Sequence, residues 1–296
     1  AYDTIPPDPE VAAGILDYPV PAAWDNLSAH QPWASSEGSA DDLIADLNPQ
    51  QRAAVEHSGS PLLIVAGAGS GKTAVLTRRI AYLLRMRGVA PGQILAITFT
   101  NKAAAEMRDR VIDLVGPTAT RMWVATFHSA CVRILREQAH LLPGLNTNFT
   151  IYDADDSKRL LGMIAKDLQI NAQKFPPRLL AAAISALKTE LTDPDAASDE
   201  AAATRNPFDR TIAEVYAEYQ RRLRAANALD FDDLIGETVR VFTTHPEIAA
   251  YYRKRFRHVL IDEYQDTNHA QYVLISTLVG TGPDASELSV VGDSDQ

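Results

Sequence analysis

The sequence predicts an α/β fold in which a parallel sheet carries helices on both faces and is interrupted by an all-helical insertion. From residue 62 to residue 152, short apolar segments alternate with segments of helix length, which is typical of βα units in a parallel sheet. Strand-like segments then disappear over residues 155–242 and return at 259–261 and 288–291. The simplest architecture is one sheet domain whose chain is split by a helical domain.

The individual elements follow from the spacing of apolar residues, which is continuous in buried strands and three to four positions in helices. The expected strands of the first part are residues 62–65, 94–98, 122–126 and 149–152, and the expected helices are residues 73–87, 102–115 and 129–142. In the insertion, helices are expected at residues 157–168, 178–187 and 210–226, joined by a polar and mobile stretch at 192–205. The resulting domains are an acidic, Pro-rich tail (1–44), a sheet domain (45–152 and 236–296) and the helical insertion (153–235).

The composition is typical of a soluble globular protein. Of the 296 residues, 46% are hydrophobic and 22% are charged. The sequence contains neither a secretory signal pattern nor the ~20 consecutive apolar residues of a membrane span, so we expect no membrane contact. Cys131 is the only cysteine, which excludes an internal disulfide and favours a reducing, cytoplasmic location. The seven histidines show no spacing typical of a zinc site.

The net charge of −10 is unevenly distributed along the chain. Residues 1–48 contain nine acids and no Lys or Arg, so the remaining residues have 29 acids against 28 bases. Residues 78–136 contain ten bases against three acids. A local excess of this kind can follow a phosphate backbone, although it is equally compatible with ordinary solvated helix faces.

Residues 66–73 read AGAGSGKT between a predicted buried strand and a predicted helix, which is the setting of a phosphate-binding loop. Glycines let backbone N–H groups surround phosphates, and the helix N-terminus adds partial positive charge. The residues expected to bind nucleotide are Ala66, Gly67, Ala68, Gly69, Ser70, Gly71, Lys72 and Thr73. Lys72 would contact the β- and γ-phosphates, and the Thr73 hydroxyl would bind Mg²⁺. Ala66 departs from the strict pattern, which begins with glycine.

A second segment, HVLIDEYQDTN at residues 258–268, provides the acidic partner of this loop. Its apolar strand places Asp262 and Glu263 at the carboxyl end. Asp262 would hold Mg²⁺ through the outer coordination shell, and Glu263 would accept a proton from the attacking water. Either motif alone could be a coincidence. Together, each at a strand end, they predict hydrolysis of ATP or GTP.

Six motifs in order resemble those of superfamily 1A DNA helicases of the UvrD/PcrA/Rep family, and most closely their actinobacterial UvrD- and PcrA-like members. They are LNPQQ (47–51), ITFTNKAAAEM (97–107), TFHS (126–129), ALDFDDLI (228–235), DEYQD (262–266) and VVGDSDQ (290–296). The resemblance covers about residues 45–296 and implies a RecA-like P-loop NTPase domain with an inserted helical domain. It further implies an ATP- and Mg²⁺-dependent 3′→5′ helicase of DNA repair or replication restart, which acts on single-stranded DNA and on junctions between single-stranded and duplex DNA.

The resemblance also implies roles for individual residues. Gln51 matches a glutamine that reads the adenine edge, Gln265 one near the γ-phosphate and attacking water, and Gln296 one that senses the γ-phosphate and relays it to DNA. The positions that match DNA-contacting segments are Phe99, Thr100, Asn101, Thr126, Phe127 and His128. Partners among repair proteins cannot be read from the sequence.

Two of these DNA-contact assignments have an alternative in ordinary packing, and one acidic group outside them could suggest a metal site. Aromatic rings beside polar and cationic groups suit sequence-tolerant binding of single strands, and Phe99 before Thr-Asn-Lys fits this pattern, but a core position also fits. For His128, the role of an ordinary structural histidine fits nearly as well. Asp230, Asp232 and Asp233 form an acidic group, which the resemblance interprets as a structural helix start and not as a metal site.

Two departures from the family pattern bear on function. Ala74 stands where many relatives have an arginine, which removes or moves one nucleotide contact. The later family motifs, including the arginine fingers of a second RecA-like domain, are not in the sequence, so we expect this chain to be nearly inactive by itself as an ATPase. The alternatives are an NTPase of another class, such as a small-molecule kinase or a transport ATPase, and a non-catalytic module that binds single-stranded DNA or a partner.

Overall fold

The computed structural model describes residues 40–67 and 71–293, which form two compact units. The sheet unit contains residues 40–67, 71–127, 250–267 and 278–293, and the helical unit contains residues 128–249 and 268–277. Most of the predicted acidic tail, residues 1–39, lies outside the described residues.

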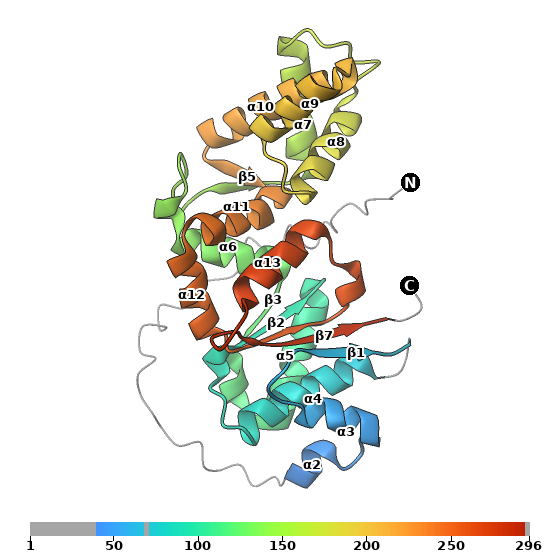
Figure 1. Cartoon of the computed structure of the whole chain (residues 1–296), viewed down its shortest axis with the longest axis vertical. Helices are drawn as coiled ribbons and strands as arrows, with labels where there is room; N and C mark the ends of the chain where they lie inside the picture. The colour runs from blue at the N-terminus through green and yellow to red at the C-terminus, as the bar shows by residue number, and fades with distance from the viewer. Residues whose placement is uncertain (1–39, 68–70, 294–296) are drawn as a thin grey trace. The chain divides into compact units, whose positions relative to one another are not determined.

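The sheet unit is built on a five-stranded parallel sheet with the strand order β1-β7-β6-β2-β3 (Figure 1). Its strands are β1 (Leu62–Val65), β2 (Ile94–Thr98), β3 (Trp123–Thr126), β6 (His258–Ile261) and β7 (Glu287–Gly292). Its helices include α2 (Ala40–Ile44), α3 (Pro49–Glu56), α4 (Lys72–Arg85) and α5 (Asn101–Val115). The predicted α/β class with a parallel sheet and flanking helices is confirmed.

The strand sequences explain where each strand lies in the sheet. All residues of β2 and β6 are buried, as expected for central strands of a parallel sheet that is covered on both faces. Strand β1 is an edge strand of this sheet and alternates in burial, with the Leu63 side chain 61% exposed. Helices α4 and α5 contribute apolar side chains to one core with β2, β3, β6 and β7.

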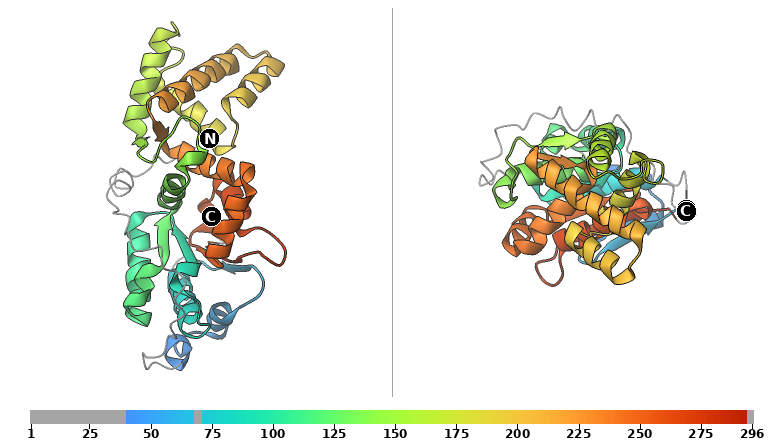
Figure 2. Two further views of the ribbon diagram at one scale, coloured as in Figure 1. Left: turned by 90° about the vertical axis from the view of Figure 1, so that its left-hand side faces the viewer. Right: turned by 90° about the horizontal axis from the view of Figure 1, so that it is seen from above.

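The helical unit corresponds to the predicted insertion and extends beyond it on both sides. Its elements are α6 (Phe127–Glu137), β4 (Thr150–Tyr152), α7 (Ala154–Asp167), α8 (Pro177–Thr189), α9 (Pro194–Thr204), α10 (Pro207–Ala225), β5 (Ala228–Asp230) and α11 (Phe231–Thr244). Helices α12 (Pro246–Arg255) and α13 (His269–Val279) each contain residues of both units. Helices α7 to α10, coloured yellow-green to orange in Figure 2, enclose an apolar core of their own.

Some elements of the helical unit differ from the prediction. The strand expected at residues 149–152 does not join the main sheet, because β4 pairs in parallel with β5 in a separate two-stranded sheet. The stretch 192–205, expected to be mobile, forms helix α9. Asp193 accepts a hydrogen bond from the Ala196 N–H as N-cap, and Pro194 occupies the first helical turn, which are both favourable signals for a helix start.

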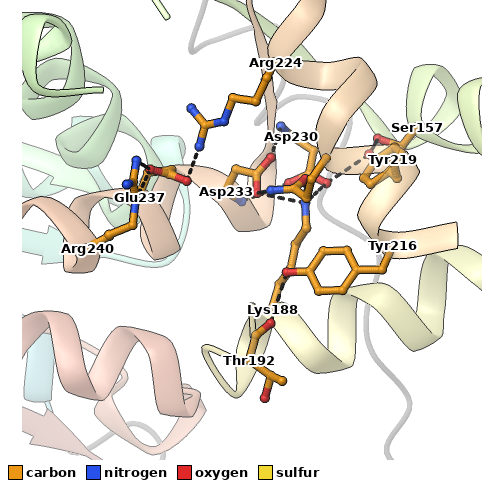
Figure 3. A network of polar contacts seen from close by, with 11 residues as sticks. Ser157, Lys188, Thr192, Tyr216, Tyr219, Arg224, Asp230, Asp233, Glu237 and Arg240 are labelled. Atoms are coloured by element: carbon orange, nitrogen blue, oxygen red, sulfur yellow. Dashed lines mark hydrogen bonds and ion pairs between the residues drawn. The ribbon is translucent and has the colours of Figure 1, made fainter. Parts of the chain in front are cut away.

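A buried polar network lies where helices α8, α10 and α11 of the helical unit meet (Figure 3). The Lys188 ammonium lies 2.6 Å from an Asp230 carboxylate oxygen and 2.8 Å from one of Asp233, and it donates to Gln220 Oε1 at 3.0 Å. The Tyr219 hydroxyl donates to the same Asp230 oxygen at 2.9 Å. The acidic group at 230–233 is therefore organised around one cation, which joins α8, α10 and the start of α11.

Asp232 makes the stability of this unit dependent on pH. Burial and the neighbouring Asp230 carboxylate raise the pKa of Asp232 from its ordinary value of 3.8 to about 7. A raised carboxyl pKa favours the folded state while the group is protonated, so this stabilisation is complete below pH ~4 and is lost as pH rises toward 7. Asp232→Asn should remove this contribution. We expect the melting temperature of the variant to match that of the unmodified protein near pH 4 and to exceed it at pH 7. An equal difference at both pH values would contradict the assignment.

No helix within the described ranges is both long and apolar enough to cross a membrane.

Cys131 is buried and forms no disulfide, and burial raises the pKa of its thiol to about 12.

Candidate functional site

Five parallel strands end at one edge of the sheet unit, and the predicted site residues follow directly after them. Val65 of β1 precedes the phosphate loop, Ile261 of β6 precedes Asp262, and Gly292 of β7 precedes Asp293. The carboxyl ends of parallel strands are the usual location of ligand sites in open α/β sheets. The fold thus brings together residues that are up to 221 positions apart in the chain.

The phosphate loop leads into helix α4. Gly71 is the N-cap and adopts a left-handed conformation (φ 81°, ψ 23°), which glycine accepts without steric cost. The first residues of α4 are Lys72 and Thr73, so the backbone N–H groups of this helix end point toward the loop. Of the loop residues, Ala66 and Gly67 follow β1 directly, whereas Ala68, Gly69 and Ser70 lie outside the described residues.

The Thr73 hydroxyl donates to an Asp262 carboxylate oxygen at 3.2 Å. Asp262 is 5% exposed, and burial raises its pKa. A hydroxyl and a carboxylate side by side fit Mg²⁺, which takes one or two protein oxygens and completes its octahedron with water and phosphate oxygens. A cluster of three or more His, Cys, Asp or Glu side chains suited to a metal does not occur in the described part of the chain.

Lys72 forms an ion pair with Asp293, at 2.9 Å between Nζ and Oδ2. This hydrogen bond raises the pKa of Lys72. Asp293 belongs to the VVGDSDQ motif, of which only Gln296 was predicted to act in the site, and Gln296 lies outside the described residues. The signal for Asp293 was present in the sequence, because it lies two residues after a predicted strand, much as Asp262 follows another.

Glu263 is held by Gln265. The Gln265 amide nitrogen donates to Glu263 Oε2 at 2.6 Å, and the Gln265 amide oxygen accepts from the Asp293 N–H at 3.0 Å. Glu263 itself has a left-handed backbone (φ 51°, ψ 44°), which is uncommon for a residue with a side chain and is found preferentially at functional sites. Gln265 therefore joins the carboxyl ends of β6 and β7 at the predicted general base.

Gln51 lies on the two-turn helix α3. Its backbone N–H and side chain form a capping box with Asn48, at 2.9 and 3.1 Å. Its side-chain amide nitrogen lies beside Gly71: a Cβ atom on Gly71, which glycine lacks, would be 3.8 Å from that nitrogen. The predicted adenine-reading side chain is thus adjacent to the N-terminus of the phosphate-loop helix.

The residues predicted to contact DNA differ in accessibility. Phe99 is half-buried and contacts Phe127 edge-on at a ring distance of 5.7 Å. Thr126 and Phe127 are each 2% exposed, so Phe127 supports Phe99 from the core. Thr100 is exposed and caps helix α5 by accepting from the Ala103 N–H at 3.1 Å.

Asn101 and His128, the other two predicted DNA contacts, differ in the partners of their side chains. The Asn101 side-chain amide nitrogen is buried without a hydrogen-bond partner within the described structure, although buried donors are usually paired. His128, in the helical unit, contacts the Phe231 ring edge-on at 5.5 Å, and burial lowers its pKa to about 4. His128 is therefore neutral near pH 7.

A pocket of about 290 Å³ in the sheet unit connects the two groups of residues. It is lined by Thr73, Thr98, Phe99, Thr100, Ala103, Glu106, Arg110, Asp262 and Glu263. The side chains predicted for hydrolysis and the aromatic ring predicted for DNA contact therefore border one cavity.

Comparison with known proteins agrees with this geometry. Residues 47–296 match the UvrD/REP helicase N-terminal domain. The chain is 65% identical over 276 residues to ATP-dependent DNA helicase UvrD1 of Mycobacterium tuberculosis, which covers 91% of this chain and 36% of that protein. It is 47% identical over 254 residues to ATP-dependent DNA helicase PcrA of Bacillus subtilis, covering 86% and 33%. The chain thus spans about a third of the length of these curated relatives.

The similarity extends over the phosphate loop, the acidic strand end and the helical unit alike, so the resemblance noted from the six motifs is confirmed. The chain belongs to the UvrD/REP helicase N-terminal domain family.

Proposed function

We propose that this chain binds ATP with Mg²⁺ and supplies one half of the motor of a 3′→5′ DNA helicase that moves along single-stranded DNA. The relatives named above are ATP-dependent DNA helicases. The observation that carries the proposal is the pocket that Thr73, Asp262 and Glu263 share with Phe99 and Thr100. A motor needs nucleotide chemistry to change its contacts with DNA, and a cavity bordered by both sets of side chains supports such coupling.

The nucleotide half of the proposal assigns one task to each side chain. Lys72 exchanges Asp293 for the β- and γ-phosphates, and Thr73 and Asp262 hold Mg²⁺, which neutralises phosphate charge when bound. Glu263 accepts the proton of the attacking water, while Gln265 keeps that carboxylate in position. Gln51 reads the adenine edge, and Gln296 relays the state of the γ-phosphate to the DNA side.

The DNA half rests on the segment after β2. Phe99 offers a ring face and Thr100 an exposed hydroxyl, and the buried amide nitrogen of Asn101 has no hydrogen-bond partner among the described residues. These are the groups that bind bases and phosphates of a single strand without sequence preference. Thr126 and Phe127 would support this segment from the core, and His128 of the helical unit is a further proposed DNA contact. The substrates would be single strands and junctions with duplex DNA, in repair or replication restart.

Binding of a labelled oligonucleotide to Phe99 variants tests the DNA half. Phe99→Leu keeps apolar volume but removes the ring face, so we expect affinity for single-stranded DNA to fall by about 1–3 kcal/mol with the melting temperature nearly unchanged. Fluorescence anisotropy provides the affinity and calorimetry the stability. A large loss of stability without loss of affinity would instead make Phe99 a core residue.

The motor itself is tested by stimulation and polarity. In a form of the protein that hydrolyses ATP, single-stranded DNA should accelerate hydrolysis, and a duplex with a 3′ single-stranded tail should be unwound in preference to one with a 5′ tail. DNA binding without any stimulated hydrolysis would favour the non-catalytic alternative. Hydrolysis that is indifferent to DNA would favour an NTPase of another class.

A further inference from the structure

Arg79 is a fully buried cation of helix α4 that has no place in the chemistry described above. Its side chain is 1% exposed, and burial lowers its pKa. The carboxylate of Glu287 lies 3.8 Å away, at the outer limit of an ion pair. A guanidinium removed from water requires other partners for its charge.

Those partners are mainly backbone carbonyls at the C-terminus of α3. One terminal nitrogen of Arg79 donates to the carbonyl oxygens of Ala54, Val55 and His57 at 3.0, 3.2 and 2.8 Å, and Nε donates to Ser289 Oγ on β7 at 2.8 Å. Helix α3 has no basic residue in its own last turn. Arg79 therefore supplies, from α4, the positive charge that the negative end of the α3 dipole favours, and it binds α3 to β7.

The opposite end of α3 carries Gln51. The helix has eight residues, about two turns of a stiff rod, so fixing its C-terminus also fixes the direction of its N-terminus. Gln51 lies beside Gly71, whereas Arg79 lies about two turns further along α4 from Lys72. Arg79 therefore contacts the far end of α3 and reaches no phosphate position itself.

We propose that Arg79 is a positioning residue for recognition of the nucleotide base: by holding α3, it sets the Gln51 amide against the purine edge and thereby the preference for adenine over guanine. This inference rests on the proposed role of Gln51. A glutamine amide can accept from adenine N6 and donate to N7, whereas guanine presents acceptors at both corresponding positions. The discrimination therefore depends on the orientation of one amide, and a small rotation of α3 would weaken it.

The test compares the affinities of fluorescent ATP and GTP analogues for the 296-residue chain. Arg79→Lys keeps the charge but cannot bind three carbonyls and Ser289 together, since Lys is a point donor without the guanidinium fork. We expect the ATP:GTP affinity ratio to fall about tenfold, the equivalent of one hydrogen bond at the upper end of its usual strength. The affinity for tripolyphosphate, which has no base, should stay unchanged.

Arg78→Lys is the matched control. Arg78 is the neighbouring residue of α4 and also donates to a backbone carbonyl, that of Leu43 in α2, at 2.8 Å. Its replacement should leave the ATP:GTP ratio unaltered. If Arg79→Lys does not fold, Ser289→Ala removes only the contact of Nε with β7 and should lower the ratio in the same direction by a smaller factor. An unaltered ratio in a folded Arg79 or Ser289 variant overturns the inference.

Gln51→Ala separates this inference from the function on which it rests. If that variant retains the ATP:GTP ratio of the unmodified chain, the adenine-reading role of Gln51 is wrong, whatever Arg79 does. If the ATP:GTP affinity ratio falls in Gln51→Ala but not in Arg79→Lys, only the proposed role of Arg79 is wrong. If both hold, the double variant should show the same ratio as Gln51→Ala, because Arg79 acts through that side chain.

Discussion

Replacement of Glu263 by glutamine is expected to slow ATP hydrolysis by about 10²–10⁴-fold and to leave ATP affinity nearly unchanged. The group that accepts the proton from water would be lost, whereas Lys72, Thr73 and Asp262 would still bind phosphates and metal. The glutamine oxygen can also accept the hydrogen bond that Gln265 donates to Glu263, so the surrounding geometry should persist. Single-turnover hydrolysis and direct nucleotide binding, in a form of the protein that hydrolyses ATP, provide the two quantities.

Two variants serve as controls for this experiment. Asp113→Asn removes one negative charge from an exposed position of α5 and should change neither quantity. Lys72→Ala should weaken binding and turnover together, because it removes a phosphate contact and leaves Asp293 without its cation. Near-normal turnover in Glu263→Gln would exclude Glu263 as the base.

Replacement of Lys188 by methionine is expected to lower the free energy of unfolding by about 3–5 kcal/mol, as when one partner of a buried ion pair is removed. Methionine fills similar space, but the carboxylates of Asp230 and Asp233 would lose the ammonium that lies 2.6 and 2.8 Å from them. Chemical denaturation that follows the helical unit would measure the effect.

The matched control is Lys166→Met on the exposed side of α7, which should change stability by less than about 0.5 kcal/mol. Adding Asp230→Asn and Asp233→Asn to the Lys188→Met variant removes the unpaired charges and should restore part of the loss. A Lys188→Met variant as stable as its Lys166 counterpart would show that the network contributes little.

The parts of the fold that could be predicted are those specified by local pattern. The runs ILAIT and HVLI are largely apolar because both faces of the sheet are covered at its central strands. The run LLIV also predicted a strand, although it lies at the edge of the described sheet. Helix α9 was missed because its buried residues are only Ala197 and Ala201, which give a weak apolar stripe. Strand β5 was missed because its three residues acquire strand structure by pairing with β4, 78 positions earlier in the chain.

The same distinction applies to the candidate site. Lys72 and Thr73 could be predicted because they open a helix after a glycine-rich loop, and Asp262 and Glu263 because they follow an apolar strand. The structure brings Thr73 and Asp262 into contact. The bridge from Gln265 to Asp293 depends on β6 and β7 being neighbours, which spacing along the chain does not specify. An arginine on an amphipathic helix predicts a solvated face, so the burial of Arg79 could not be foreseen.

The left-handed backbone of Glu263 has a consequence for how this protein can be altered. Folding alone would favour glycine or asparagine at φ 51° and ψ 44°, because a longer side chain in this region carries a steric penalty. A selection for heat resistance, or a design procedure that optimises the folded state, would therefore tend to replace the carboxylate that we propose as the general base. If Glu263 has the proposed role, stability and hydrolysis make opposite demands on this position, and some stability of the folded state is lost to keep the carboxylate.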